Sequence, residues 1–144
     1  LFRSPTAGVV MARIGESIYV KEICYTPGIT PIQSKQLLFS NGVSVNTPVY
    51  CEHDKDIVAQ LRRLNVLALP ANKGPNSIAS GISKVKEFKI FYTASSKNIE
   101  EERSRYIWIK NELNGKATNT PIDTHNHLMD AIRYGIYTHY FRAS

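Results

Sequence analysis

The chain has 144 residues, of which 42% are hydrophobic and 21% charged, and its formal net charge is +6. Its length suits a single globular domain, 1–144, and its composition is ordinary for a soluble protein. No apolar stretch approaches the roughly 20 residues that cross a bilayer. The first residues also lack the pattern of a secretory signal, so neither a membrane partner nor secretion is expected.

The basic excess favours a polyanionic partner only weakly, because many basic proteins never bind nucleic acid. The sequence pI is about 9.4. Basic residues are scattered rather than gathered in an arm, and they include Lys84, Lys86 and Lys89 in one stretch and Arg62 and Arg63 in another. Any contact with DNA must therefore come from a folded surface.

The two cysteines, Cys24 and Cys51, lie in apolar segments that are typical of strands. They indicate buried reduced thiols and a reducing cytoplasm, because a disulfide framework or a zinc site needs more sulfurs at closer spacing. The four histidines do not complete a structural zinc pattern with them.

The first third of the chain has the pattern of a β-hairpin followed by a helix. Small and β-branched residues form two runs on either side of a short turn, and Pro27-Gly28 ends the second run. The expected elements are strand 7–14, a turn at Gly15-Glu16, strand 18–25 and helix 31–40, which Asn41-Gly42 breaks.

Short apolar runs then alternate with helical patterns. The expected elements are strand 48–51, a helix with Ile57, Leu61 and Leu64 on one face, strand 66–70, loop 71–76, a helix with Ile78, Ile82 and Val85 on one face, strand 89–93, helix 98–110, a polar segment 111–121 and helix 125–140. We expect Ser77 to cap its helix and Asn114-Gly115 to form a hairpin turn.

This order of elements predicts an α/β fold, in which the N-terminal hairpin and the later strands form a mixed sheet flanked by helices. It suits an RNase H-like core, although several other α/β folds share it. Ligands of such sheets gather at the carboxyl ends of strands. Glu52 follows the strand 48–51, at such an end.

The last helix carries the second acid of interest, Asp130. Helical spacing places His127, Asp130 and Tyr134 on one face. We expect the opposite face to be buried against the sheet, because it carries an apolar stripe. That stripe consists of Leu128, Ile132 and Ile136.

Two carboxylates from distant segments suit Mg²⁺ or Mn²⁺. In two-metal cleavage of a phosphodiester, such acids hold ions about 4 Å apart. The residues alone leave a simpler interpretation open for each acid. Glu52 would then pair with a nearby Lys or Arg, and Asp130 would form a helix-surface salt bridge with Arg133.

Residues 126–134, Asn-His-Leu-Met-Asp-Ala-Ile-Arg-Tyr, resemble the His-x-x-Asp-Ala-x-Arg-Tyr helix that closes the nuclease domain of tailed-phage terminase large subunits. Further segments resemble the same family in the same order: 4–7, 25–30, 68–78, 81–82 and 121–123. The resemblance implies an RNase H-like endonuclease that cuts concatemeric viral double-stranded DNA with a cluster of acids and two Mg²⁺ or Mn²⁺ ions. The resemblance also implies that the protein acts in the host cytoplasm. Its expected partners are an ATPase domain of the same polypeptide, a small terminase subunit and a portal protein.

The resemblance also assigns roles by position. Glu52 takes the place of the second acid and Asp130 that of the third, so both are expected to be catalytic metal ligands. His127 falls on the family's histidine one helical turn before the last acid, where it would tune the metal or touch DNA. The residues expected to contact DNA are Lys73, which falls on the family's loop lysine, Lys84 and Arg133.

The chain departs from the family's pattern in two ways. No carboxylate precedes Glu16, so the first acid is expected either before Leu1 or in an altered site. Glu52 replaces an Asp, which would shift a metal by roughly 1 Å unless the backbone or Asp54 compensates. No Gly-x-x-x-x-Gly-Lys-Ser/Thr motif occurs, so the ATPase domain is expected upstream.

Two alternatives stay open on the residues. A resolvase or transposase core shares the fold and the acid geometry. A non-catalytic DNA-docking module would use its acids only in salt bridges.

Overall fold

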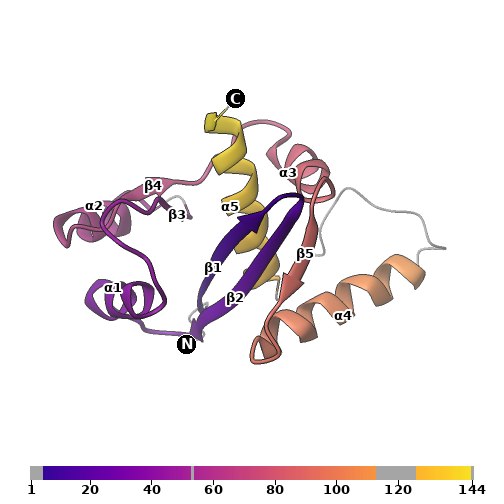
Figure 1. Ribbon diagram of the computed structural model, residues 1–144, viewed down its shortest axis with the longest axis horizontal. Coiled ribbons are helices and arrows are strands. Elements are labelled where there is room, and N and C mark those ends of the chain that lie inside the picture. The colour runs from indigo at the N-terminus through magenta and orange to yellow at the C-terminus, as the bar shows by residue number, and fades with distance from the viewer. Residues whose placement is uncertain (1–4, 53, 113–125, 144) are drawn as a thin grey trace.

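The computed structural model describes residues 5–52, 54–112 and 126–143. For residues 106–112, 142 and 143 it describes the backbone alone. Its elements in chain order are β1 (Thr6–Ile14), β2 (Ser17–Thr26), α1 (Pro31–Ser40), β3 (Val49–Cys51), α2 (Lys55–Arg63), β4 (Ala68–Pro70), α3 (Ser77–Val85), β5 (Lys89–Tyr92), α4 (Lys97–Glu112) and α5 (His127–Ala143). The expected α/β class is confirmed. In Figure 1, α5 passes behind the hairpin of β1 and β2, and α1 and α2 lie on the opposite side of it from α4.

The N-terminal hairpin forms as its pattern predicts. β1 pairs with β2 in antiparallel register from Thr6 opposite Thr26 to Ile14 opposite Ser17. Gly15 takes a φ of 61° in the connecting turn, a conformation that costs glycine little because it has no Cβ. β5 then adds in parallel on the far side of β2, so the sheet is mixed, in the order β1-β2-β5.

β3 and β4 form a separate parallel pair. We expected all strands to share one sheet, but among the described residues no strand joins β1 to β3. Both of these strands line one wide groove, which is described below. The acid at the end of β3 therefore faces this groove.

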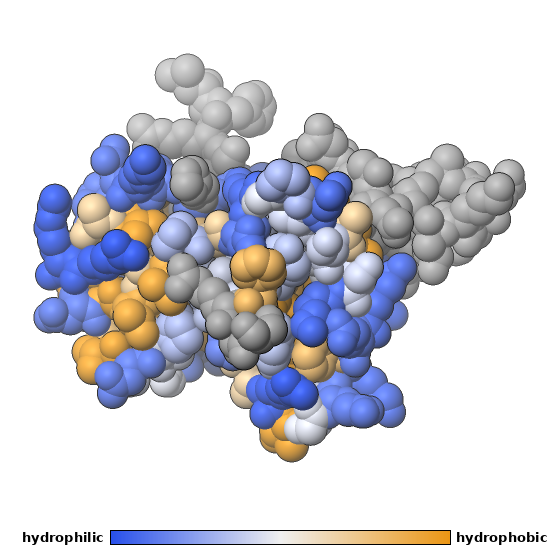
Figure 2. Space-filling view, turned by 90° about the horizontal axis from the view of Figure 1, so that it is seen from above, coloured by the Kyte–Doolittle hydropathy of each residue, from blue (hydrophilic) through white to orange (hydrophobic). Residues whose placement is uncertain are grey.

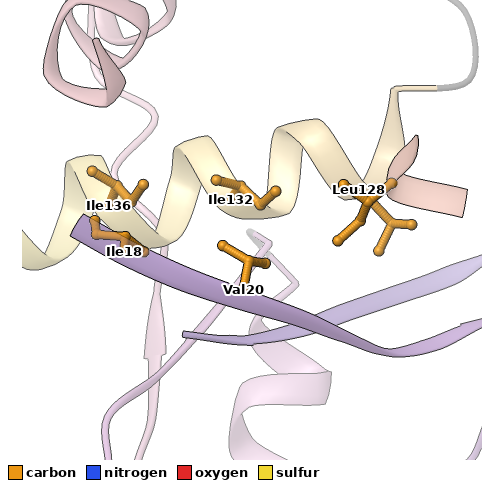
Figure 3. Close-up of a cluster of buried hydrophobic side chains, with 6 residues drawn as sticks. Ile18, Val20, Leu128, Ile132 and Ile136 are labelled. Carbon is orange, nitrogen blue, oxygen red and sulfur yellow. The ribbon is translucent and has the colours of Figure 1, made fainter. Parts of the chain in front are cut away.

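The apolar stripe of α5 is buried as predicted. Leu128, Ile132 and Ile136 are 0%, 5% and 2% exposed. Figure 3 shows them beside the strand that carries Ile18 and Val20, and all five belong to one core cluster. Burial of such a side chain contributes about 1.5–3 kcal/mol, so this stripe determines which face of α5 remains for the groove.

Three details differ from the expectation. Asn76, with a φ of 61° and no side-chain cap, precedes α3, and Ser77 is already inside the helix. Ile57 and Ile78 are each 44% exposed, because α2 and α3 present other residues to the interior. In α2 the buried residues are Val58 and Leu61. His125 and the expected turn at Asn114-Gly115 lie outside the described residues.

Hydrophobic residues also reach the surface. In Figure 2 they appear in orange at the end of the molecule that α1 and α2 form, and Ile32 on α1 is 59% exposed. Within the described residues, none of the helices combines the length and the apolar character that a membrane span requires.

Candidate functional site

A groove of about 1170 Å³ lies between the two sheets. Residues of β1, β2, β3, α1, α2 and α5 form its walls. The predicted site residues that line it are Glu52, Lys73, His127 and Asp130. Tyr134 lines it as well, so the face of α5 predicted to be polar opens into this groove.

Glu52 follows β3 directly, and its side chain is 74% exposed. Lys73, from the loop between β4 and α3, donates to Glu52 Oε1 at 3.0 Å. Burial by itself would lower the pKa of Lys73, but the hydrogen bond to Glu52 is among the opposing effects that raise it above its ordinary value. The lysine therefore stays charged beside the carboxylate.

Asp130 is paired within its own helix. Arg133 Nη2 donates to Asp130 Oδ1 at 3.2 Å, and the arginine is only 8% exposed. Burial raises the pKa of Asp130 above its ordinary value, Arg133 and His127 oppose this, and the charge of Glu52 adds to it. The charge of Glu52 therefore acts on Asp130, and both residues line the same groove.

Tyr134 connects the two ion pairs. Lys73 Nζ lies 5.2 Å from the centre of its ring, and Arg133 Cζ lies 5.0 Å from it. Both distances suit cation–π contacts. Two cations, each paired with a carboxylate, therefore lie near one aromatic ring.

The loop that carries Lys73 is anchored to α5. The Asn72 backbone N–H donates to Thr138 Oγ1 at 2.8 Å, and Thr138 is 1% exposed. The Gly74 N–H donates to Asn72 Oδ1 at 3.0 Å, which closes a tight turn around the lysine. Lys73 is thus held beside the helix that carries Asp130.

Two further residues of the groove escaped the sequence analysis. Tyr50 on β3 and His139 on α5 form a hydrogen bond of 2.8 Å between the phenol oxygen and Nδ1. Both residues line the groove. They are 89 positions apart, and nothing in either local pattern indicates the contact. The bond ties the strand of Glu52 to the helix of Asp130.

Glu102 on α4 is a third residue that the sequence did not reveal. It is 1% exposed and accepts hydrogen bonds from the backbone N–H groups of Leu128 and Met129, at the start of α5. Glu102 stands in a charged run, Glu100-Glu101-Glu102-Arg103, which by itself indicates a solvated helix face. Its role appears only in the packing.

The other predicted residues lie apart from this cluster or have different contacts. Lys84 pairs with Glu87 at 3.2 Å and lines a second cavity, of about 380 Å³. Arg133 is buried, which leaves little of its surface for a phosphate. Its predicted contact with DNA is not tested by any observation here. Asp54 caps α2 through the N–H groups of Asp56 and Ile57, at 2.9 and 3.3 Å. His53 lies outside the described residues.

Comparison with known proteins then identifies the family. Residues 16–137 match the model of the terminase RNase H-like domain. The chain belongs to this family. The match covers β2 through most of α5, and it favours a terminase over the resolvase and transposase cores that share the fold class.

Two solved structures share the fold of this terminase-family chain. The g2p (large terminase) nuclease domain of bacteriophage SPP1, with bound Mn, aligns with a TM-score of 0.71 at 19% identity, over 98% of this chain and 80% of that one. A large terminase from a thermophilic bacteriophage aligns with a TM-score of 0.70 at 22% identity, over 94% of this chain and 36% of that one. Among curated proteins, none matches.

The expected RNase H-like fold and the resemblance to terminases are therefore confirmed. Within the described parts of the chain, no group of three or more His, Cys, Asp or Glu side chains is placed to hold a metal ion. The residues that line the groove nevertheless include three carboxylates and two histidines, namely Glu52, Asp54, Asp130, His127 and His139.

Proposed function

We propose that this chain is a divalent-metal-dependent endonuclease domain that cuts concatemeric viral double-stranded DNA during genome packaging. The observation that carries the proposal is the shared groove, in which Glu52 and Asp130, distant in the sequence, face the same space. Membership of the terminase RNase H-like family supports it. So does the SPP1 nuclease domain of the same fold, which was solved with Mn.

The donor set fits a hard divalent cation. Glu52 and Asp130 would hold Mg²⁺ or Mn²⁺ through carboxylate oxygens, which these ions prefer. His127, in the same groove, would adjust the site or contact DNA. Two ions require at least one more carboxylate, and Asp54, which also lines the groove, is a candidate. When bound, the metal would activate water and stabilise the leaving oxygen, which leaves a 3′-hydroxyl on the DNA.

Lys73 is the basic residue best placed to hold the DNA backbone at this site. Its side chain is 37% exposed and lies beside Glu52. A lysine there would contact phosphate rather than base edges, so the binding would be largely independent of sequence. Lys84 would add a phosphate contact outside the groove. The expected partners are an ATPase domain of the same polypeptide, a small terminase subunit and a portal protein, in the host cytoplasm.

The test is cleavage of supercoiled plasmid in Mn²⁺ by the full-length gene product. Asp130→Asn and Glu52→Gln should each lower the cleavage rate at least about a hundredfold, because each removes a charged metal ligand. The matched control is Glu100→Gln, an acid on α4 that pairs with Lys97 and does not line the groove. If Asp130→Asn cut as fast as the parent, the catalytic assignment would be wrong.

A second candidate function is a non-catalytic DNA-docking module. The observation in its favour is that each acid already has a cationic partner, Lys73 for Glu52 and Arg133 for Asp130. Titration with Mn²⁺ separates the two functions. A docking module would bind DNA with an affinity that Mn²⁺ does not change, and Asp130→Asn would not alter metal binding.

A further inference from the structure

Glu102 is a buried carboxylate that reaches from one helix to the beginning of another. Its Oε1 accepts from the backbone N–H of Met129 at 3.0 Å and of Leu128 at 3.1 Å, and its Oε2 lies 3.3 Å from the Leu128 nitrogen. At 1% exposure it is among the most buried polar residues of the described chain. Such burial is costly unless the carboxylate has defined partners.

The contact has a physical basis in the helix terminus. The first N–H groups of an α-helix have no partner inside the helix, and the N-terminal end of the helix dipole favours negative charge. A capping residue next to the helix in sequence defines only where the helix begins. Glu102 belongs to α4, so its bonds also define where the first turn of α5 lies relative to α4.

α4 is itself attached to the sheet in the same way. Glu22 on β2 accepts from the N–H groups of Asn98 and Ile99, at 2.8 and 3.1 Å, and from the Asn98 side chain at 2.8 Å. Two carboxylates therefore connect β2 to α4 and α4 to α5. The first turn of α5, with His127 and Asp130, stands at the end of this connection.

We propose that Glu102 is a positioning residue for the metal site: by holding the first turn of α5 it places Asp130, and His127 beside it, at the groove. The inference rests on the proposed function, since it assumes that Asp130 binds the metal. The apolar stripe fixes the helix as a whole against the sheet. Leu128 also anchors the N-terminal turn through apolar contacts, and the bonds from Glu102 add a directional restraint on the backbone of that turn.

The length of the side chain provides the test. Glu102→Gln keeps an acceptor oxygen at the same reach but removes the charge. Glu102→Asp keeps the charge but is one methylene shorter, so it falls roughly 1.5 Å short of the α5 N–H groups. Mn²⁺ is titrated into the full chain at a temperature at which every variant is folded by circular dichroism.

If Glu102 acts by position, Glu102→Asp should weaken Mn²⁺ binding about tenfold or more, which is the usual effect of losing a residue that orients a metal ligand. Glu102→Gln should retain most of the affinity. If only its charge matters, the order is reversed and the inference is overturned. The control is Ile99→Val, which loosens α4 without removing a hydrogen bond to α5 and should bind Mn²⁺ like the parent. An equal loss in Ile99→Val and Glu102→Asp also overturns it.

Failure of the proposed function would look different. A parent chain whose Mn²⁺ binding is absent, or is unchanged by Asp130→Asn, overturns the proposed function and this inference with it. A parent that binds Mn²⁺ through Asp130, together with a Glu102→Asp variant that binds it equally well, overturns this inference alone.

Discussion

Lys73 and Glu52 form an ion pair of 3.0 Å at the edge of the groove. The lysine ammonium is thus paired with Glu52 Oε1, an oxygen of a carboxylate that the proposed function assigns to a metal ion. A dication approaching Glu52 would repel this ammonium, and the displaced lysine would then be available to a DNA phosphate. The ion pair therefore opposes metal binding.

This opposition predicts that Lys73→Met strengthens Mn²⁺ binding. Exposed ion pairs contribute about 0.2–1 kcal/mol, so the expected gain in affinity is about 1.4-fold to fivefold. The same variant should bind DNA more weakly. Lys84→Met is the control, because it removes the same charge from a lysine paired with Glu87 outside the groove. Equal Mn²⁺ affinities of the two variants, measured by calorimetry, would contradict the prediction.

Gly81 allows α3 to lie against the Arg133 side chain. A Cβ at this position would stand 2.9 Å from Arg133 Cγ and 3.2 Å from Cδ, both closer than normal contact. Overpacking costs about 1–3 kcal/mol, and the better helix propensity of alanine returns about 1 kcal/mol. Gly81→Ala should therefore lower the free energy of unfolding by about 1 kcal/mol and disturb the pairing of Arg133 with Asp130.

The control for that substitution is Gly135→Ala on α5. Its Cβ would meet only the terminal methyl of Met11, which can move away. Urea denaturation should show little loss of stability for this variant. A Gly81→Ala variant as stable as Gly135→Ala would show that Arg133 adjusts freely.

Two isoleucines on helices test the assigned core. Ile132 is 5% exposed and packs against the sheet, whereas Ile78 is 44% exposed. Ile132→Ala should lower the free energy of unfolding by about 2–5 kcal/mol, and Ile78→Ala should change it by less than about 1 kcal/mol. Thermal unfolding followed by circular dichroism measures both, and similar melting temperatures would refute the packing of α5.

The pH dependence of stability should reflect Glu102. Burial raises its folded-state pKa above the ordinary value of 4.5, although hydrogen bonds from Met129 and Leu128 oppose the shift. Between the ordinary and the raised pKa, the folded state binds more protons than the unfolded state, so the free energy of unfolding falls as pH rises. The contribution is complete below pH 4.5 and is lost as the pH passes the folded-state pKa.

Glu102→Gln should remove this part of the pH dependence. The comparison is urea denaturation of parent and variant from about pH 4 to about pH 7. Burial also raises the pKa of Asp130, so this residue adds a pH dependence of the same sign. Asp130→Asn should therefore remove a further part of the pH dependence in the same experiment. If the free energy of unfolding varied with pH in the same way for the parent and for Glu102→Gln, the buried carboxylate would not be the source of the pH dependence.

Local patterns in the chain were enough to predict most of its elements. The hairpin of β1 and β2, the helix α1 and the buried stripe of α5 follow from alternation, helical spacing and turn residues, which act between near neighbours. Glu52 and Asp130 were found as candidates in the same way, from a strand end and a helix face. The order of amino acids was thus sufficient to predict these elements and to single out both acids as candidates.

The meeting of distant groups, in contrast, became visible only in the folded chain. Lys73 and Glu52, Tyr50 and His139, and Glu102 and Leu128 are 21, 89 and 26 positions apart. Their contacts depend on how helices and strands pack, which no local spacing contains. The exposure of Ile57 and the separation of β3 and β4 from the other strands have the same origin. A residue's environment is set by the whole fold, whereas its tendency to form a helix or strand is set by its neighbours.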